Sequence, residues 1–537
     1  MNVFLLYHTL KHLRVRQLLY QCWYRLYKHR LVNVDCPFDI KRKWWVEPVV
    51  KPISLLSDDS FYFVNIRSCF TGWNEQKHGN LWTYNLNYMD WLCQEGIDYA
   101  TGEKWINYFV EEIHSIKLGM DPYPTSLRTI NWIKFICKHW DKIDFDSRDK
   151  WNNALYTQIV HLERRLEYHL LGNHLLEDFY GLFIAALYFE DERLYNKISR
   201  LLLRELHEEI LPDGAHYEQS PMYHCVLLDR LLDCYNFSSQ NKCFKGQDKV
   251  TNQLKTYAQQ MLGHLESIVY LKTEYSGSKI PLLNDSAVGI APTYDDLCNY
   301  ACRLGIKFNK IELGACGYRK LKNRRMEALV DVGNITASYQ PGHTHADTFN
   351  FELLIDGVPF IVDTGISTYN KTQRRQYERS TSAHNTVSVD ERNSSEVWGG
   401  FRVGRRACVN IEEDTPNRIK ASHNGFKKTL DFGVQCVHVR TFEMFEDKWC
   451  VVDNVMGGKT AIAYLHFSPN VKIEPLKNDM LQTSVAKICF RGASHIELLD
   501  AKVSKEYNVF ENTKKVAVHF HNTLETVIIP NEMRGEL

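Results

Sequence analysis

Residues 341 to 347 read PGHTHAD, and this stretch holds the first group of side chains whose types and spacing could do chemistry. In an extended segment, side chains two apart point to the same side, so His343, His345 and Asp347 would form one polar row. Such a row could hold a metal ion, transfer protons or cap a buried strand. A lone histidine pair is more often structural than catalytic, so the rest of the chain has to decide.

The chain downstream of this row carries more polar groups than an ordinary β domain needs. They are Asp363, Arg374, Arg375, Arg379 and His384. Two histidines and one aspartate suit zinc well. A plain two-residue turn at Asp356-Gly357, however, would place Asp363 on the strand face opposite His345, so a β-bulge or a longer turn is required. Spacing alone therefore does not establish a metal site.

The stretch GNHLLEDFYG, further upstream, carries polar residues at helical spacing. Asn173 lies four residues before Glu177, and His174 lies four before Asp178, so each pair shares a helix face. An ordinary N-terminal turn with asparagine and histidine as capping groups explains the same residues. On this motif alone, capping is the favoured interpretation.

The stretch LPDGAHYEQSPMYH contains Ser220-Pro221, a good pair for the N-cap and first position of a helix. Tyr223 is then expected in a first helical turn, where the helix dipole favours a phenolate and would lower its pKa. A tyrosine base would need such a shift. The alternative is a tyrosine packed at a domain seam, and taken alone that interpretation is favoured.

Length and composition indicate what kind of fold must position these side chains. The chain has 537 residues, enough for two domains with substantial cores. Lys+Arg and Asp+Glu balance at 65 each, so no basic excess points to nucleic acid as a partner. The 15 cysteines are scattered without a CxxC pair and indicate reduced thiols.

The first thirty residues hold six Lys/Arg and no acid around a short apolar run. The run is too short for a signal-peptide core, and a basic amphipathic helix is predicted. We expect it to pack on the following domain; contact with an anionic membrane or polysaccharide is the open alternative. No run is long enough to span a membrane. A cytoplasmic location is expected, or a periplasmic or secreted one if an export signal has been removed.

The apolar spacing changes once along the chain. From about residue 80 to about 305 it is helical, in segments such as TSLRTINWIKFICKHW, and short turns separate the segments. After about residue 325 it alternates with period two, as in FNFELLIDGVPFIVDTG. An all-α half followed by an all-β half is predicted.

Six motifs in this order resemble the heparinase II/III-like superfamily of polysaccharide lyases, with most similarity to the heparinase III group. They are LWTYNLNY, DPYPTSLRTINW, GNHLLED, DGAHYEQSPMYH, GHTHADTFNFELLIDGVPFIVDTG and STSAHNTVSVD. The resemblance covers roughly residues 80 to 470. It implies an α+β multidomain protein with a lead-in at 1–80, an (α/α) toroid at 81–322 and an antiparallel β-sandwich at 323–537. The active site would lie in the cleft between toroid and sandwich.

The resemblance also implies β-elimination at a uronic acid. A base takes the proton from C5, the C4 oxygen departs, and a C4–C5 double bond remains. By the family pattern, Asn173 and His174 look like the groups that neutralise the carboxylate, Tyr223 looks like the proton-transfer group, and His343 looks like its partner. A zinc ion that organises the cleft would be held by His345, Asp363 and His384. Asp347 is left as a support for a ligand or as a strand cap.

The expected partner is an acidic polysaccharide, and heparin or heparan sulfate is the first expectation. Lysis of the producer's own capsule or exopolysaccharide, or of alginate, hyaluronan or chondroitin, stays open. Residues that could contact substrate are Trp82, Tyr84, Arg128, Trp132, Glu177, Glu218, Tyr369 and Arg379. Two rivals also stay open: a glycoside hydrolase with Glu177 and Glu218 as its carboxylates, and a non-catalytic carbohydrate-binding or assembly factor.

Overall fold

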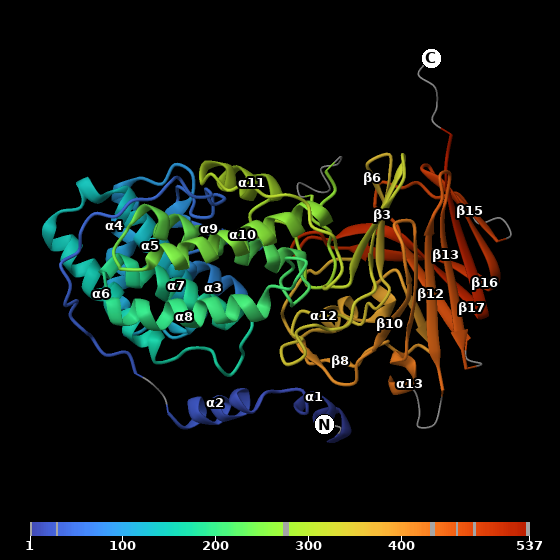
Figure 1. The fold of residues 1–537 in the computed structure, drawn as a ribbon, viewed down its shortest axis with the longest axis horizontal. Helices are drawn as coiled ribbons and strands as arrows, with labels where there is room; N and C mark the ends of the chain where they lie inside the picture. Colours follow the sequence, from blue (N-terminus) through green and yellow to red (C-terminus); the bar gives the residue numbers. More distant parts are fainter. Residues whose placement is uncertain are drawn as a thin grey trace, which may run out of the picture.

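A computed structural model describes residues 3–27, 30–271, 279–429, 435–457, 460–475 and 479–532. The molecule is elongated, with the helices gathered at one end and the strands at the other (Figure 1). This is the predicted order of an all-α half followed by an all-β half.

The helical half is built around one helix that is buried on every side. Its helices are α3 (Asn80–Tyr88), α4 (Tyr99–Glu112), α5 (Pro122–Lys138), α6 (Phe145–Glu163), α7 (Asn173–Phe189), α8 (Glu192–Glu209), α9 (Pro221–Gln240), α10 (Gln247–Ile268) and α11 (Tyr294–Arg303). Helix α7 packs against α5, α8 and α9, and every one of its residues except His174 is buried. A helix that is apolar all round has to lie inside its domain. The predicted (α/α) toroid is confirmed.

The β half consists of antiparallel sheets. A four-stranded sheet is formed by β3 (Tyr318–Lys322), β4 (Met326–Asp331), β5 (Phe351–Ile355) and β6 (Val358–Ile361). The larger sheet runs in the order β10 (Val409–Asp414), β11 (Arg418–His423), β12 (Val437–Met444), β13 (Trp449–Met456), β17 (Glu511–Pro530), β14 (Thr460–His466) and β7 (Val387–Val389). Two more strands extend it beyond β17, namely β16 (Ala486–Val503) and β15 (Met480–Gln482). Phe351 of the small sheet packs edge-on against Phe442 of the large one, so the two sheets share a core and the predicted sandwich is confirmed.

Short elements complete the chain. A hairpin of β1 (Ser60–Phe63) and β2 (Ile66–Cys69) precedes the toroid, and α12 (Gln373–Glu378), β8 (Val397–Trp398), β9 (Arg402–Val403) and α13 (Gly425–Thr429) are inserted in the β half. Strand β3 pairs along its length with β4, so the β half begins at residue 318 rather than 323. The period-two pattern is weak there because β3 has two partly exposed residues in succession.

The β5–β6 hairpin contains the irregularity that the sequence requires. Asp356 and Gly357 both have positive φ, 52° and 77°, as a tight two-residue hairpin turn demands. The register of the pair then shifts between Leu353 and Leu354, which is a β-bulge. The hairpin thus contains a β-bulge, but residues 341–347 form turns rather than a strand, so the bulge does not by itself place Asp363 beside His345.

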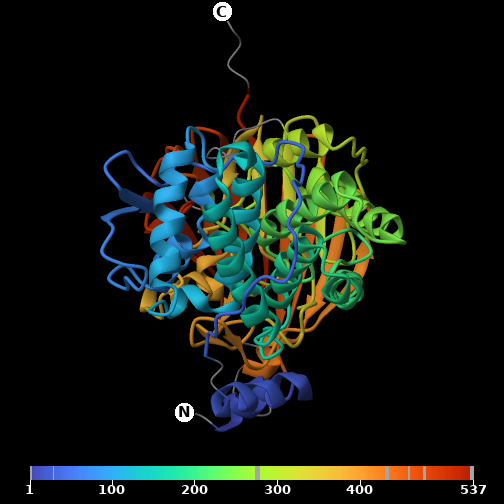
Figure 2. The same cartoon turned by 90° about the vertical axis from the view of Figure 1, so that its left-hand side faces the viewer.

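The N-terminal segment forms two helices rather than the single one expected. Helix α1 (Val3–Leu10) and helix α2 (Val15–Leu26) lie outside the body of the molecule along one edge (Figures 1 and 2). They touch both halves, because Gln17 Nε2 donates to Leu170 O of the toroid and to Tyr339 O of the β half, at 3.0 and 3.2 Å. Within the described residues, no helix has the length and apolar character of a membrane span.

Arg128, proposed from sequence as a substrate contact, instead ties the toroid together. Its side chain is fully buried and donates to Asn87 O and Gly119 O, both at 2.8 Å, and to Gln158 Oε1 at 2.7 Å. These acceptors come from the end of α3, the short turn at Leu118–Met120 before α5, and α6. The spacing of α5 could not reveal this role, because nearly all of that helix is buried.

Replacing Arg128 with alanine should lower the free energy of unfolding by at least ~2 kcal/mol, because buried acceptors lose their donor. Urea denaturation measures this. Arg324→Ala, at an exposed position, is the matched control and should change stability by less than ~0.5 kcal/mol. Wild-type stability of Arg128→Ala together with a raised KM would restore the substrate-contact role.

Candidate active site

A cavity of about 1410 Å³ lies between the two halves. Its wall includes Asn173, His174 and Tyr223 from the toroid and His343 and Tyr369 from the β half. The four residues proposed for catalysis therefore face one space, and neither half encloses it alone.

Tyr223 lies in the first turn of α9, as its sequence position predicts. Ser220 caps this helix, since its Oγ accepts from the Tyr223 backbone N–H at 3.2 Å. The phenol ring stacks on His343 with centroids 3.9 Å apart, and its hydroxyl lies 3.3 Å from that of Tyr369. Burial raises the pKa of Tyr223 above its ordinary value. The expectation that the helix dipole lowers this pKa is therefore wrong, because desolvation outweighs it.

Asn173 begins α7 and pairs with a partner outside its helix. Its Nδ2 donates to Glu218 Oε2 at 2.9 Å, and its backbone N–H donates to Glu218 Oε1 at the same distance. Gly172 has φ +61°, and a Cβ there would stand 2.3 Å from Glu218 Oε1. The glycine thus lets the carboxylate approach, and the i,i+4 pairing of Asn173 with Glu177 is not formed.

His174 is the one residue of α7 that is not buried, and it faces the cavity. Its Nδ1 lies 3.1 Å from Glu167 Oε2. Partial desolvation alone would lower the pKa of His174, but the Glu167 carboxylate raises it above the ordinary value. Asp178 instead accepts the backbone N–H of Glu167 at 2.7 Å, so it steadies the loop that carries the partner of His174.

Asp285 joins the histidines of the PGHTHAD segment. This segment forms turns rather than a strand, yet both rings reach the same carboxylate: His343 Nδ1 lies 2.9 Å from Oδ2, and His345 Nε2 lies 2.8 Å from Oδ1. Arg375 Nη2 donates to Oδ2 at 2.7 Å. Burial would raise the pKa of Asp285, but Arg375 and the histidines lower it well below its ordinary range.

Asp285 was not predicted from sequence. It lies in the stretch IPLLNDSAVG, which has neither a motif nor a periodic pattern. In the sequence, Arg375 is one of several arginines in its stretch and nothing sets it apart. Their pairing links residues ninety positions apart, and no local signal marks it.

The three proposed zinc ligands lie in one chain of contacts, but only two face a common point. His345 Nδ1 and His384 Nε2 are 3.3 Å apart. Two nitrogen ligands of a tetrahedral zinc ion stand about 3.3 Å apart, since each Zn–N bond measures about 2.0–2.1 Å. Asp363 Oδ2 instead lies 2.8 Å from His384 Nδ1, the nitrogen on the far side of the ring. Here Asp363 orients a histidine rather than presenting an oxygen beside both imidazoles.

Asp347 and Asp213 are two further buried acidic groups near possible metal ligands. Asp347 is buried, and its Oδ2 has no hydrogen-bond partner among the described residues. Asp213, His264 and Cys316 form a separate cluster, but backbone N–H groups of Gly314 and Cys316 already satisfy Asp213 Oδ2.

The remaining proposed substrate contacts divide by position. Tyr84 and Tyr369 line the cavity, whereas Trp82 and Trp132 are core residues of the toroid. Arg379 is buried and donates to Thr344 O at 2.8 Å, so it shapes the PGHTHAD turn instead of meeting a ligand. Glu177 and Glu218 are buried and absent from the cavity wall. For these aromatic and arginine residues, the sequence alone does not distinguish a side chain packed in the core from one that contacts substrate.

Comparison with known proteins agrees with this architecture. Residues 142–299 match the family model described as the heparinase II/III N-terminus, and residues 307–532 match the one described as heparinase II/III-like, C-terminal. A heparin-sulfate lyase of Pedobacter heparinus is 25% identical over 253 residues, 41% of this chain and 36% of the relative. The match thus spans about a third of the relative's length.

Solved structures show the same fold at lower identity. A heparinase III structure superposes with a TM-score of 0.67 at 14% identity, over 95% of this chain and 88% of that one. A heparan sulfate lyase from Pedobacter heparinus gives a TM-score of 0.55 at 15% identity, over 96% and 88%.

The Asp285–Arg375 pair is testable by a double-mutant cycle. Asp285→Asn alone should lower the free energy of unfolding by roughly 3–5 kcal/mol, because it leaves the Arg375 charge buried and unpaired. Adding Arg375→Met should recover a large part of that loss in urea denaturation. Purely additive losses would show that the two side chains do not depend on each other.

Proposed function

The chain belongs to the heparinase II/III-like superfamily, and from that premise we propose that it cleaves a uronic-acid-containing polysaccharide by β-elimination. One observation carries the proposal: Asn173, His174, Tyr223 and His343 come from two domains and line the same cavity. A binding protein has no need of such a complete set of proton-transfer groups.

The reaction first requires that the substrate carboxylate be neutralised, since otherwise the C5 proton is too weakly acidic. His174 carries a pKa raised by Glu167, so its imidazolium form is favoured beside the cavity. The Asn173 amide is held in place by Glu218. We propose that these two groups bind the substrate carboxylate and stabilise the negative charge that develops on it. Loss of one such hydrogen-bond donor typically lowers the rate ~10²–10³-fold.

Two proton transfers follow, and the contacts favour different groups for them. Burial keeps the Tyr223 phenol protonated, which suits a donor to the departing O4. Asp285 lies 2.9 Å from Nδ1 of His343, and a carboxylate on one ring nitrogen favours an acceptor at the other. That other nitrogen, Nε2, lies 3.4 Å from Asn173 Nδ2 and 3.3 Å from Glu218 Oε2. We therefore assign His343 Nε2 as the base for the C5 proton and Tyr223 as the acid.

We also propose that His345 and His384 hold a zinc ion, with Asp363 orienting His384 or joining the ligands. The ion would supply positive charge that fixes the two rings. His345 in turn contacts Asp285, which holds His343. The metal would thus organise the base without taking part in proton transfer.

The cavity wall bears on which polymer is cleaved. It carries six basic residues, Arg25, Lys51, Arg230, Lys371, Arg402 and Arg406, and six acidic ones, Asp90, Asp121, Glu167, Asp229, Asp296 and Glu506. Heparan sulfate is the first substrate to test. The even charge balance favours a sulfate-poor uronate polymer, such as alginate, hyaluronan or a capsular polysaccharide, as the second.

A screen of acidic polysaccharides tests the class of reaction. Elimination creates a C4–C5 double bond conjugated to the carboxylate, which absorbs in the ultraviolet, whereas hydrolysis creates no such chromophore. New reducing ends without absorbance would identify a hydrolase. Binding without either product would identify a non-catalytic factor.

Tyr223→Phe should reduce turnover at least ~10²-fold with an unchanged melting temperature, because it removes only the proposed acid. Tyr235→Phe, on the same helix and outside the cavity wall, is the matched control. A uronide with fluoride at C4 needs little protonation on departure, so it should restore the rate of Tyr223→Phe but not of His343→Ala. Equal rescue of both variants would contradict the division of roles.

His345→Ala should lower bound zinc and the melting temperature, since it removes a proposed ligand. His343→Ala, only two residues away, should keep its metal and lose activity. Metal analysis by mass spectrometry and a thermal melt compare the two purified variants. If both lose metal equally, or neither does, the proposed separation of ligand and base is wrong.

A further inference from the structure

Helix α2 exposes its apolar face to solvent. Val15, Leu19 and Leu26 are 71%, 65% and 78% exposed, and Trp23 is 46% exposed. Their spacing follows one stripe of an α-helix, the face that normally packs on a protein core. Here the stripe points away from the protein.

The opposite face of α2 fixes this orientation through polar contacts. Gln17 donates to carbonyls of both halves, and Tyr24 Oη donates to Leu166 O at 2.6 Å. The guanidinium of Arg16 stacks over Tyr168 at 3.6 Å, and that of Arg14 stacks over Tyr339 at 3.8 Å. These contacts hold the stripe outward.

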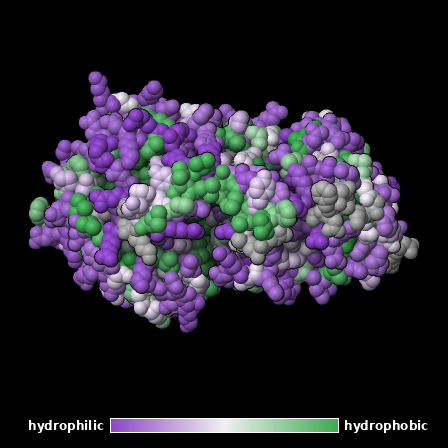
Figure 3. Space-filling view, turned by 90° about the horizontal axis from the view of Figure 1, so that it is seen from below, coloured by the Kyte–Doolittle hydropathy of each residue, from purple (hydrophilic) through white to green (hydrophobic). Residues whose placement is uncertain are grey.

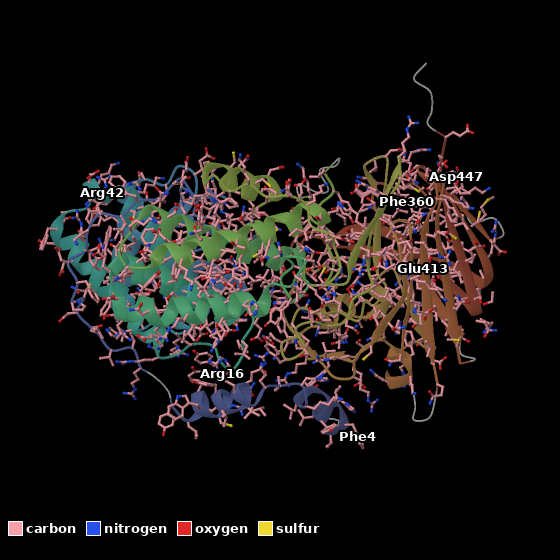
Figure 4. The ribbon with its side chains drawn as sticks, in the orientation of Figure 1. Phe4, Arg16, Arg42, Phe360, Glu413 and Asp447 are labelled. Carbon is pink, nitrogen blue, oxygen red and sulfur yellow. The ribbon has the colours of Figure 1, made fainter. Side chains whose placement is uncertain are left out.

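Helix α1 continues the same surface. Val3, Phe4 and Tyr7 are 77%, 69% and 61% exposed, while Thr9 Oγ1 accepts from Trp398 Nε1 on the inner side. Phe4 lies at the outer edge of the molecule and Arg16 lies toward the body (Figure 4). Seen from below, hydrophobic side chains gather over the two helices (Figure 3).

Positive charge surrounds this apolar surface. The first acidic residue of the chain is Asp35, and Lys11 and Arg25 are exposed beside the stripe. From the β half, Arg406 and Lys428 act on His12: burial first, then these cations, lower the pKa of His12 to about 4. Two acids beside the helices are paired with arginines, Glu208 with Arg14 and Glu396 with Arg405.

We propose that α1 and α2 form a docking surface for an anionic lipid bilayer. The apolar stripe would enter the boundary between headgroups and acyl chains, where Trp23 and Tyr27 suit the interface, and the basic rim would face lipid phosphates. A second copy of the chain would meet the same positive rim and be repelled by it, so charge complementarity favours the lipid surface.

The surface adjoins the catalytic cavity. Gln17, Gln21 and Arg25 of α2 line that cavity while the stripe faces outward. Docking would therefore place this part of the cavity wall close to the membrane, where a membrane-associated polysaccharide would be found. The docking itself does not depend on the proposed lyase activity.

Vesicle co-sedimentation of the full chain tests the proposal. Wild type should sediment with vesicles of phosphatidylcholine and phosphatidylglycerol, much less with phosphatidylcholine alone, and less as salt rises. The triple variant Val15→Asp, Leu19→Asp and Trp23→Asp should partition at least ~10-fold less, because each aspartate removes apolar burial and adds repulsion. Phe145→Asp, at an 80% exposed site on the toroid, is the control and should bind like wild type.

Several results would overturn the proposal. They are equal binding of wild type and the triple variant, no binding of wild type to vesicles that contain phosphatidylglycerol, and binding that depends on neither lipid charge nor salt concentration. A wild-type dimer in analytical ultracentrifugation that the triple variant abolishes would show that a second copy covers the stripe instead. Thermal melts check that the variants are folded, and the lipid and salt series on wild type stands even if they are not.

Discussion

The buried carboxylate of Asp285 is the group on which the rest of the site depends. It is the shared partner of Arg375, His343 and His345. Arg375 donates to both of its oxygens, and each histidine contacts one of them. A buried charge is costly unless it is paired and fully hydrogen-bonded, so the carboxylate holds all three partners in place. The position of the catalytic ring and that of the proposed metal ligand are thereby coupled.

The same constraint explains why the site needs both domains. Asp285 lies between α10 and α11, whereas Arg375, His343 and His345 belong to the β half. On the toroid side, Ser220 Oγ donates to Asp285 O at 2.6 Å, so the cap of the Tyr223 helix and the carboxylate belong to one connected structure. Tyr223 and His343 can stack because these links set the distance between the halves.

The order of domains, the Ser220 cap and the bulge before Asp363 were predictable from sequence, because periodicity and turn chemistry are local. The partners of Asn173 and His343 were not, because Glu218 and Asp285 are distant in the chain. The burial of individual side chains was the second feature that the sequence did not predict. It reversed the expected pKa shift of Tyr223 and placed Arg128 and Arg379 in packed interiors, and neither effect leaves a pattern in residue spacing.

The seam between the halves also bears on how this protein would lose function. The seam combines apolar packing with polar links. Leu329, Leu354 and Ile366 of the β half join the toroid core, while Gln219 Nε2 donates to Asn334 O and Tyr270 Oη donates to Glu352 Oε2. Local openings in proteins tend to follow such boundaries between cooperative units. A slight separation of the halves would move the catalytic residues apart while most of each core stays packed. The fold can thus pass through an intact but inactive state long before it unravels.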